Sequence, residues 1–179
     1  MAARAIVGIA LGILFAPVIY ILLQTLSYYT AFSGWFGSLL NGDFTTFFSN
    51  WILGGVWSMQ APIMSSASFP VSMIWGFGPT GSLLSAWLPM YLAGLVTWTI
   101  IGAWAGAIER SAGRGIGVGV GIWLGWLIIE IIVMALGGIT FYLPGISYLV
   151  EYLLANLLTV IVVIVVAAIF GAMTKSEEF

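Results

Sequence analysis

Cysteine and histidine are both absent from this chain of 179 residues. Without cysteine the chain can form no disulfide, thiolate metal site or iron–sulfur cluster, and it has no thiol nucleophile. Without histidine it lacks the commonest metal ligand and the commonest general base. These two absences exclude most catalytic and redox mechanisms for the chain acting alone, and we expect it to bind no cofactor.

Charge is also scarce, since only 6% of the residues are charged whereas 62% are hydrophobic. A soluble domain is about a quarter charged. Four basic and six acidic residues cannot keep such a chain in water, so we expect lipid to surround most of it. Four basic residues are also too few for a nucleic-acid-binding surface. The composition therefore excludes a soluble enzyme, a secreted module and a disordered protein.

Four long apolar runs cover roughly residues 5–27, 83–108, 116–136 and 147–173. A helix that spans a bilayer needs about 20 mostly apolar residues. The first run is too long for a signal peptide and has no cleavage site after it, so we expect it to be retained. Pro17 predicts a bend within it. We predict an all-α integral membrane protein, a single polytopic domain over residues 1–179 with four transmembrane helices.

The basic residues predict how this domain is oriented. They are Arg4, Arg110, Arg114 and Lys175. With four spans, all of them lie on one side, whereas residues 28–82 and 137–146 on the other side contain no lysine or arginine. Basic residues favour the cytoplasmic side. We therefore predict a multi-pass protein of the cell membrane with both termini in the cytoplasm.

The outer segment, residues 28–82, is rich in aromatic residues and has Asp43 as its single charge. Asp43 has the character of a helix N-cap. Aromatic residues follow it at helical spacing: Phe44, Phe47, Phe48 and Trp51. This pattern predicts an amphipathic helix over residues 43–57 that lies at the outer interface, with its aromatic side chains in the membrane.

The next stretch, about residues 50–78, leaves two alternatives. It is either a re-entrant pair of half-helices, broken at Pro62 and the run Ser65–Ser68, or an interfacial segment. One complete extra crossing would separate Arg4 from the other basic residues. The charge distribution therefore favours zero or two crossings.

Glycines form a regular series in the third apolar run. Gly113, Gly117, Gly121 and Gly125 recur every four residues, with Gly115 and Gly119 beside them. The first run has a shorter series of small residues: Gly8, Gly12 and Ala16. Small residues let transmembrane helices approach closely. We predict that the four glycines form one continuous ridge for tight helix packing, within the chain or between copies.

Glu130 lies in the middle of the third run, on the same helical face as Trp123 and Trp126 and nearly opposite the predicted ridge. A carboxyl group at that depth is costly unless it has a partner. Three interpretations stay open: a proton or cation site, a pair with another subunit, or a protonated group that hydrogen-bonds a neighbouring helix. Asn156 and Thr159 in the fourth run form a small polar spot, and we group them with Glu130 as the candidate polar site.

These features favour a non-catalytic membrane subunit that packs and stabilises a larger membrane protein complex. Its partners would be lipids and either other membrane subunits or copies of itself. The alternative is a component of a proton- or cation-coupled transporter or channel that uses Glu130. A lipid-modifying enzyme using Asp43, Glu130 and Glu151 ranks third, because Asp43 and Glu130 differ too much in predicted depth. We therefore expect no enzymatic activity.

Overall fold

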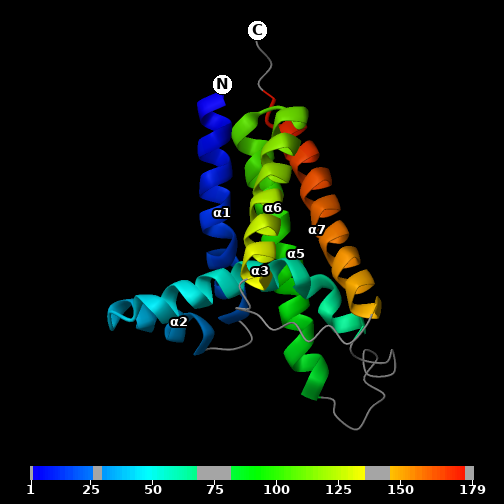
Figure 1. The fold of residues 1–179 in the computed structure, drawn as a ribbon. Coiled ribbons are helices and arrows are strands. Elements are labelled where there is room, and N and C mark those ends of the chain that lie inside the picture. The colour runs from blue at the N-terminus through cyan, green and yellow to red at the C-terminus, as the bar shows by residue number, and fades with distance from the viewer. Residues whose placement is uncertain (1, 26–29, 68–81, 136–145, 176–179) are drawn as a thin grey trace. The chain divides into compact units, whose positions relative to one another are not determined.

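The computed structural model describes residues 2–25, 30–67, 82–135 and 146–175, and these residues form helices and turns with no strand among them. The helices are α1 (Ala2–Thr25), α2 (Thr30–Leu40), α3 (Phe44–Ala67), α5 (Ser82–Glu109), α6 (Ala112–Ala135) and α7 (Ile146–Met173) (Figure 1). The chain divides into two compact units, and each is described by itself below.

Four of these helices contain a stretch that is long and apolar enough to cross a membrane. The stretches are Ala3–Gln24, Leu92–Glu109, Ala112–Val133 and Asn156–Met173, in α1, α5, α6 and α7. The prediction of an all-helical chain with four long apolar helices is confirmed for the described residues. Pro17 lies inside α1, which continues through it.

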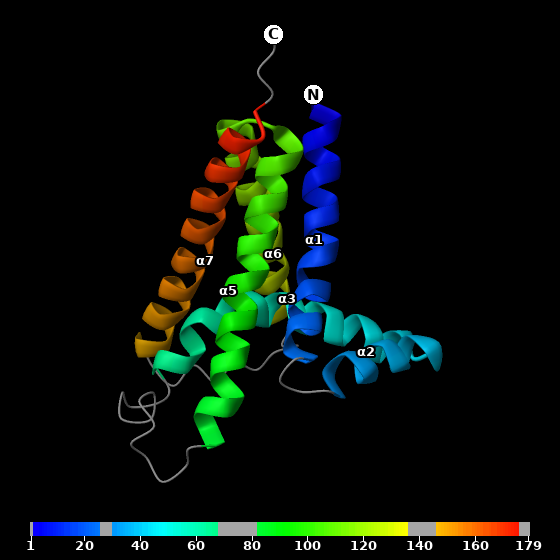
Figure 2. The same cartoon turned by 180° about the vertical axis from the view of Figure 1, so that it is seen from behind.

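Unit 1 comprises Met1–Ala16, Trp98–Tyr142 and Leu157–Phe179. It holds the first part of α1, the last part of α5, all of α6 and most of α7 (Figure 2). Within this unit the first turn of α1, the α5–α6 turn and the last turn of α7 lie at the same end (Figure 1). All four basic residues belong to these segments or directly follow them. The helices of unit 1 thus gather the basic residues at one end.

The connection between α5 and α6 is short and tightly bonded. Arg110 follows the last residue of α5 with φ 48°, in the left-handed region. Its N–H donates to the carbonyl of Gly106 at 3.0 Å, which satisfies an otherwise orphaned carbonyl at the helix end. The Ser111 carbonyl accepts from the Gly115 N–H at 2.8 Å and opens α6. The chain therefore reverses direction within two residues.

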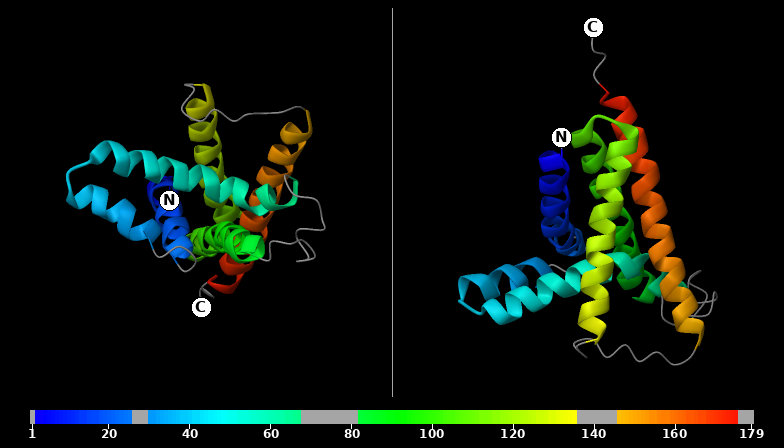
Figure 3. Two further views of the ribbon diagram at one scale, coloured as in Figure 1. Left: turned by 90° about the horizontal axis from the view of Figure 1, so that it is seen from below. Right: turned by 45° about the horizontal axis from the view of Figure 1, so that its top comes forward.

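Unit 2 comprises Pro17–Thr97 and Leu143–Asn156, and α2 and α3 run side by side in it as a helical hairpin (Figure 3). Gly42 has φ 75°, and its N–H donates to the Leu39 carbonyl at 3.1 Å. The Asp43 N–H donates to the Ser38 carbonyl at 2.9 Å, which completes a Schellman motif. Asp43 Oδ1 then accepts the Thr46 N–H at 3.0 Å as the N-cap of α3. One aspartate thus ends α2 and starts α3.

The structure bears on one of the two alternatives for the outer segment, the re-entrant pair broken at Pro62. α3 is continuous through Pro62 as far as Ala67, so a break at Pro62 is wrong. A proline removes one N–H from the helix, but neighbouring groups can compensate for it in an apolar setting. The remainder of that stretch, residues 68–78, lies outside the described residues. α2 is a further helix that the sequence pattern did not predict.

Two contacts position α1 within unit 2. Tyr20 of α1 and Ala93 of α5 are buried together, with Leu23 packed against them. A Cβ added at Gly54 of α3 would lie 3.0 Å from Ile21 Cδ1. The later part of α1 therefore packs on both α5 and α3.

Candidate functional site

The second half of the glycine series on α6 packs against α1. A Cβ at Gly121 would lie 2.7 Å from Ile9 Cδ1, and one at Gly125 would lie 2.5 Å from Ile13 Cδ1. These spacings are shorter than ordinary carbon–carbon contacts of about 3.5–4.0 Å, so a side chain at either position would force the isoleucine of α1 to move. Glycine at both positions therefore allows the close approach of α1.

The small residues of α1 lie in the same seam. A Cβ at Gly8 would lie 3.4 Å from Val118 Cγ1, and one at Gly12 would overlap the side chain of Ile122. Ala16 is fully buried. Glycines of α1 thus face branched side chains of α6, and glycines of α6 face branched side chains of α1.

The first half of the series behaves differently. Gly113 and Gly117 are exposed, and no described atom lies within 4 Å of a Cβ added at either position. A four-residue step drifts by about 40° around a helix, so Gly113 is rotated by roughly 120° from Gly125. Of the four glycines only Gly121 and Gly125 reach α1, and packing of Gly113 and Gly117 against another chain stays a prediction.

A second glycine contact, which our sequence analysis did not predict, joins α5, α6 and α7. A Cβ at Gly115 would lie 2.7 Å from Gly106 Cα, and one at Gly106 would lie 2.7 Å from the Gly171 nitrogen. A Cβ at Gly171 would lie 2.7 Å from the Ser111 carbonyl oxygen. The three backbones touch at this junction, which we call the glycine junction (Gly106, Gly115 and Gly171).

A signal for this junction was present in the sequence. Gly102 and Gly106 are four residues apart on α5, and Gly102 also lies against α7, because its added Cβ would be 3.0 Å from the Val163 carbonyl oxygen. Two glycines at that spacing mark a helix contact in the same way as a longer series.

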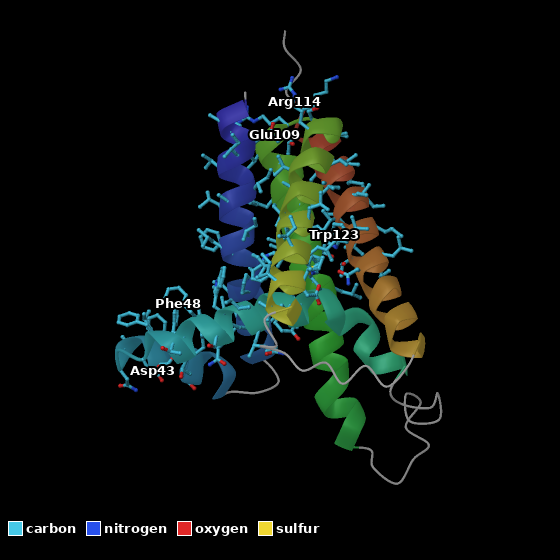
Figure 4. All side chains as sticks on the ribbon, viewed as in Figure 1. Asp43, Phe48, Glu109, Arg114 and Trp123 are labelled. Carbon is cyan, nitrogen blue, oxygen red and sulfur yellow. The ribbon has the colours of Figure 1, made fainter. Side chains whose placement is uncertain are left out.

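One hydrogen bond and one close apolar contact connect α6 to α7 beyond the glycine junction. The Trp123 Nε1–H donates to Thr159 Oγ1 at 3.2 Å, and Trp123 is marked on α6 in Figure 4. A Cβ at Gly119 would lie 2.5 Å from Val163 Cγ1. Glu130 is within about 20° of both Trp123 and Gly119 around the helix, so it belongs to the same face of α6.

The three predicted polar residues are all enclosed. Glu130 and Thr159 are fully buried, and Asn156 is 5% exposed. Asn156 lies three residues before Thr159 on α7, so the two share a helical face. The structure joins Thr159 to α6 through Trp123. A buried carboxyl group of this kind can hydrogen-bond a neighbouring helix or exchange a proton.

Trp126 contacts α1, which the sequence pattern did not predict. The sequence pattern placed it with Glu130, away from the packing face, but its Nε1–H donates to the Ile13 carbonyl of α1 at 3.2 Å. In a regular helix that carbonyl would accept the N–H of residue 17, and proline has none. Trp126 therefore supplies the hydrogen bond that Pro17 removes from α1.

The aromatic residues of the outer segment divide between two environments. Phe47 stacks on Trp35 of α2 with ring centroids 4.8 Å apart, and the Trp35 Nε1–H donates to the Phe47 carbonyl at 3.1 Å. Phe44 and Phe48 are 57% and 56% exposed, and Trp51 is half-buried. Phe47 thus holds the hairpin together, while Phe44 and Phe48 face outward.

Comparison of the chain with protein-family models, with curated proteins and with solved structures found no match. Its function is therefore inferred from its own residues.

Proposed function

We propose that the chain is a non-catalytic subunit of a larger protein complex in the cell membrane, where it packs against a partner and stabilises it. In this proposal α1, α5, α6 and α7 cross the bilayer. The end of unit 1 that carries the basic residues faces the cytoplasm, so both termini lie there. The support is the clustering of the basic residues at one end and the length and apolar character of the four helices.

One observation carries this proposal: two of the four glycines in the series on α6 pack against α1, and the other two have space beside them in the described chain. Gly121 and Gly125 contact α1, whereas a Cβ added at Gly113 or Gly117 would meet no described atom within 4 Å. We call the residues Gly113, Gly117, Leu124 and Ile128 the outer face of α6. The two larger residues on it are 44% and 56% exposed. A partner's transmembrane helix can pack there through the same kind of contact that α1 makes.

Two substitutions on the same helix test this interpretation. Gly117→Leu places a side chain on the outer face, where the described chain leaves room. We expect the protein to keep its fold and to lose its partner on native electrophoresis in mild detergent. Gly121→Leu is the matched control, because its side chain would collide with Ile9. It should disturb the fold itself, which circular dichroism and thermal melting report.

Gly117→Ala adds only one methyl group and should leave the complex intact. If Gly117→Leu still runs as the complete complex, the outer face of α6 meets only lipid and the proposal loses its main support.

A second function is favoured by the burial of Glu130. This carboxyl group is fully enclosed within the apolar stretch Ala112–Val133. Ionisable groups at that depth are rare in membrane helices and commonly mark ion or proton pathways. The chain would then be a component of a proton- or cation-coupled transporter or channel.

Glu130→Gln separates the two functions. Glutamine keeps the size and the hydrogen-bonding ability of a protonated glutamate, so a packing subunit should be almost unaffected. A proton or cation site should lose ion flux in reconstituted vesicles while native electrophoresis shows an intact assembly. We expect unchanged assembly and no change in flux. Loss of a measurable flux with intact assembly would favour the transport function instead.

A further inference from the structure

The helical hairpin of α2 and α3 has one side that is both apolar and exposed. Phe47 of α3 stacks on Trp35 of α2, and this contact fixes which faces of the two helices meet. The residue after each of them is turned by about 100° around its own helix. Because the two helices are antiparallel, both turns lead to the same side of the hairpin. Phe36 and Phe48 therefore lie on one side.

Two more large apolar residues continue this side toward the α2–α3 turn. Leu40 is four residues after Phe36, and Phe44 is four residues before Phe48, so each shares the face of its partner. In chain order the four residues are 41%, 74%, 57% and 56% exposed. We call them the apolar side of the hairpin (Phe36, Leu40, Phe44 and Phe48).

The point where α3 crosses α1 gives the depth of the hairpin. A Cβ added at Gly54 would lie 3.0 Å from Ile21 Cδ1 and 3.5 Å from the Pro17 carbonyl oxygen. The apolar stretch of α1 that is long enough to cross a membrane ends at Gln24. At 1.5 Å per residue, α3 crosses α1 about 5–10 Å before that end. This is the depth at which an interfacial helix buries its apolar face in a bilayer.

The two sides of the hairpin differ in direction as well as in chemistry. Figure 4 shows Phe48 on the side from which α1 reaches the hairpin, and Asp43 on the opposite side. With α1 across the bilayer, the apolar side faces hydrocarbon and Asp43 faces water. Asp43 is the only charged residue among residues 30–67. Insertion of the hairpin therefore depends on apolar area and not on attraction to anionic lipid.

The hairpin extends beyond the helices that it packs on. Residues 44–53 of α3 are exposed or half-buried, whereas Val56 and Met59 are fully buried. The extending part, which is α2 together with residues 44–53, is about 15 Å long and about 20 Å wide, from the rise and diameter of two helices. A helix that crosses the bilayer displaces lipid in both leaflets, but this part displaces lipid in one leaflet only.

We propose that the apolar side of the hairpin binds the acyl chains of the outer leaflet, and that the hairpin acts there as a wedge that concentrates the protein in membrane with a convex outer surface. Interfacial helices are sensitive to curvature because they need space between lipids in the leaflet that they enter. The Trp35–Phe47 contact and the hydrogen bonds of the α2–α3 turn hold the two helices together as one unit. The proposal rests on the proposed function only in placing α1 across the bilayer, and it needs no protein partner.

The first test measures what surrounds the apolar side. The chain has no cysteine, so one introduced cysteine carries a nitroxide label without background. Phe44→Cys and Ser49→Cys form a matched pair, because both side chains are exposed and lie about 140° apart around α3. In phosphatidylcholine vesicles, paramagnetic resonance compares collisions with oxygen, which enters hydrocarbon, and with a nickel chelate, which stays in water. The ratio of oxygen to nickel collisions should be severalfold higher at position 44 than at position 49.

Two results of this test would overturn the proposal. Equal access of the nickel chelate to both labels would show that the hairpin lies in water. Protection of position 44 from both reagents would show that a second copy or another protein covers the apolar side, and not lipid.

The second test measures the wedge in narrow tethers pulled from giant phosphatidylcholine vesicles. An impermeant dye added outside to Ser49→Cys marks only the molecules whose hairpin lies on the outer surface. We expect these molecules to be enriched in the tether relative to a lipid dye. Leu40→Gln with Phe44→Gln should remove the enrichment, whereas Leu40→Met with Phe44→Leu should keep it. Circular dichroism checks that all variants retain their helices.

Equal density of the labelled chain in the tether and the vesicle would overturn the wedge, as would an enrichment that survives both glutamine substitutions. Neither test involves the outer face of α6. A negative result here would therefore leave the proposed packing function standing, and loss of that function would leave these two tests unchanged.

Discussion

The hydrogen bond from Trp126 to α1 makes a quantitative prediction. Pro17 cannot donate to the Ile13 carbonyl, and the Trp126 Nε1–H does so at 3.2 Å. Trp126→Phe removes this donor and leaves the carbonyl unsatisfied in an apolar setting. If Pro17 is also changed to alanine, the N–H at position 17 can donate to Ile13 within the helix. Trp126→Phe should therefore be less damaging in the Pro17→Ala background.

The expected size follows from the group that is left unbonded. An unsatisfied buried carbonyl costs about 1–3 kcal/mol. Measured coupling between polar groups in membrane helices averages about 0.6 kcal/mol, with a maximum of about 1.7 kcal/mol. We expect coupling between Trp126→Phe and Pro17→Ala near 1 kcal/mol, between that average and that maximum, because Ile13 has no other donor within its own helix. The loss of ring volume is common to both backgrounds and cancels in the cycle.

The assay is unfolding of the four cycle members in mixed micelles by titration with a denaturing detergent, followed by circular dichroism. Trp123→Phe is the matched control, since that indole donates to Thr159 on α7 and should show no coupling to position 17. Additive effects of Trp126→Phe and Pro17→Ala, with coupling indistinguishable from that of the control, would refute the assignment of Trp126 as the compensating donor.

Three further predictions concern the helix contacts and the hairpin. Gly115→Ala forces a methyl group against the α5 backbone and should destabilise the protein by about 2 kcal/mol, which lowers Tm by roughly 4–8 °C. Gly117→Ala has room for the methyl group and should leave Tm unchanged or raise it. The hydroxyl and the backbone N–H of Thr46 lower the pKa of Asp43 from its ordinary value of about 4. The charged cap therefore stabilises α3 fully at pH values above this ordinary pKa, and the stabilisation is lost as the pH falls through the lowered pKa. Amide exchange at Thr46 should therefore show a transition on acidification that Asp43→Asn, which keeps a neutral cap, does not show. Gly42→Ala meets no described neighbour but must hold φ 75°, so it should destabilise the hairpin by about 1 kcal/mol through backbone strain alone, measurable as faster exchange at the α2–α3 turn.

The four long apolar helices were predictable because the length and hydropathy of an apolar run can be read directly from the sequence. The helix ends in the structure lie within a few residues of the predicted ones, with α6 starting earlier, at Ala112. The start of α3 was also accessible, because an aspartate before a helical pattern is a local signal. These features depend on neighbours in sequence and not on how the helices are arranged in space.

The faces of α6 were not predictable in the same way. A four-residue repeat shows that Gly113 and Gly125 are both small, but only the location of α1 decides which of them is in contact. Trp126 was assigned to the wrong face for the same reason, since its partner is a carbonyl made available by a proline more than a hundred residues earlier. α2 was missed because Gly34 and Gly37 lower its helix propensity and a partner helix compensates for this.

The measurement that tests the central claim most directly is the mass and composition of the intact assembly, extracted from native membranes in mild detergent. The account predicts that the 19.2 kDa chain is held at fixed stoichiometry with a different membrane protein, and that Gly117→Leu releases it. Recovery of the chain alone, or only as multiples of itself, with Gly117→Leu indistinguishable from wild type, would contradict the account.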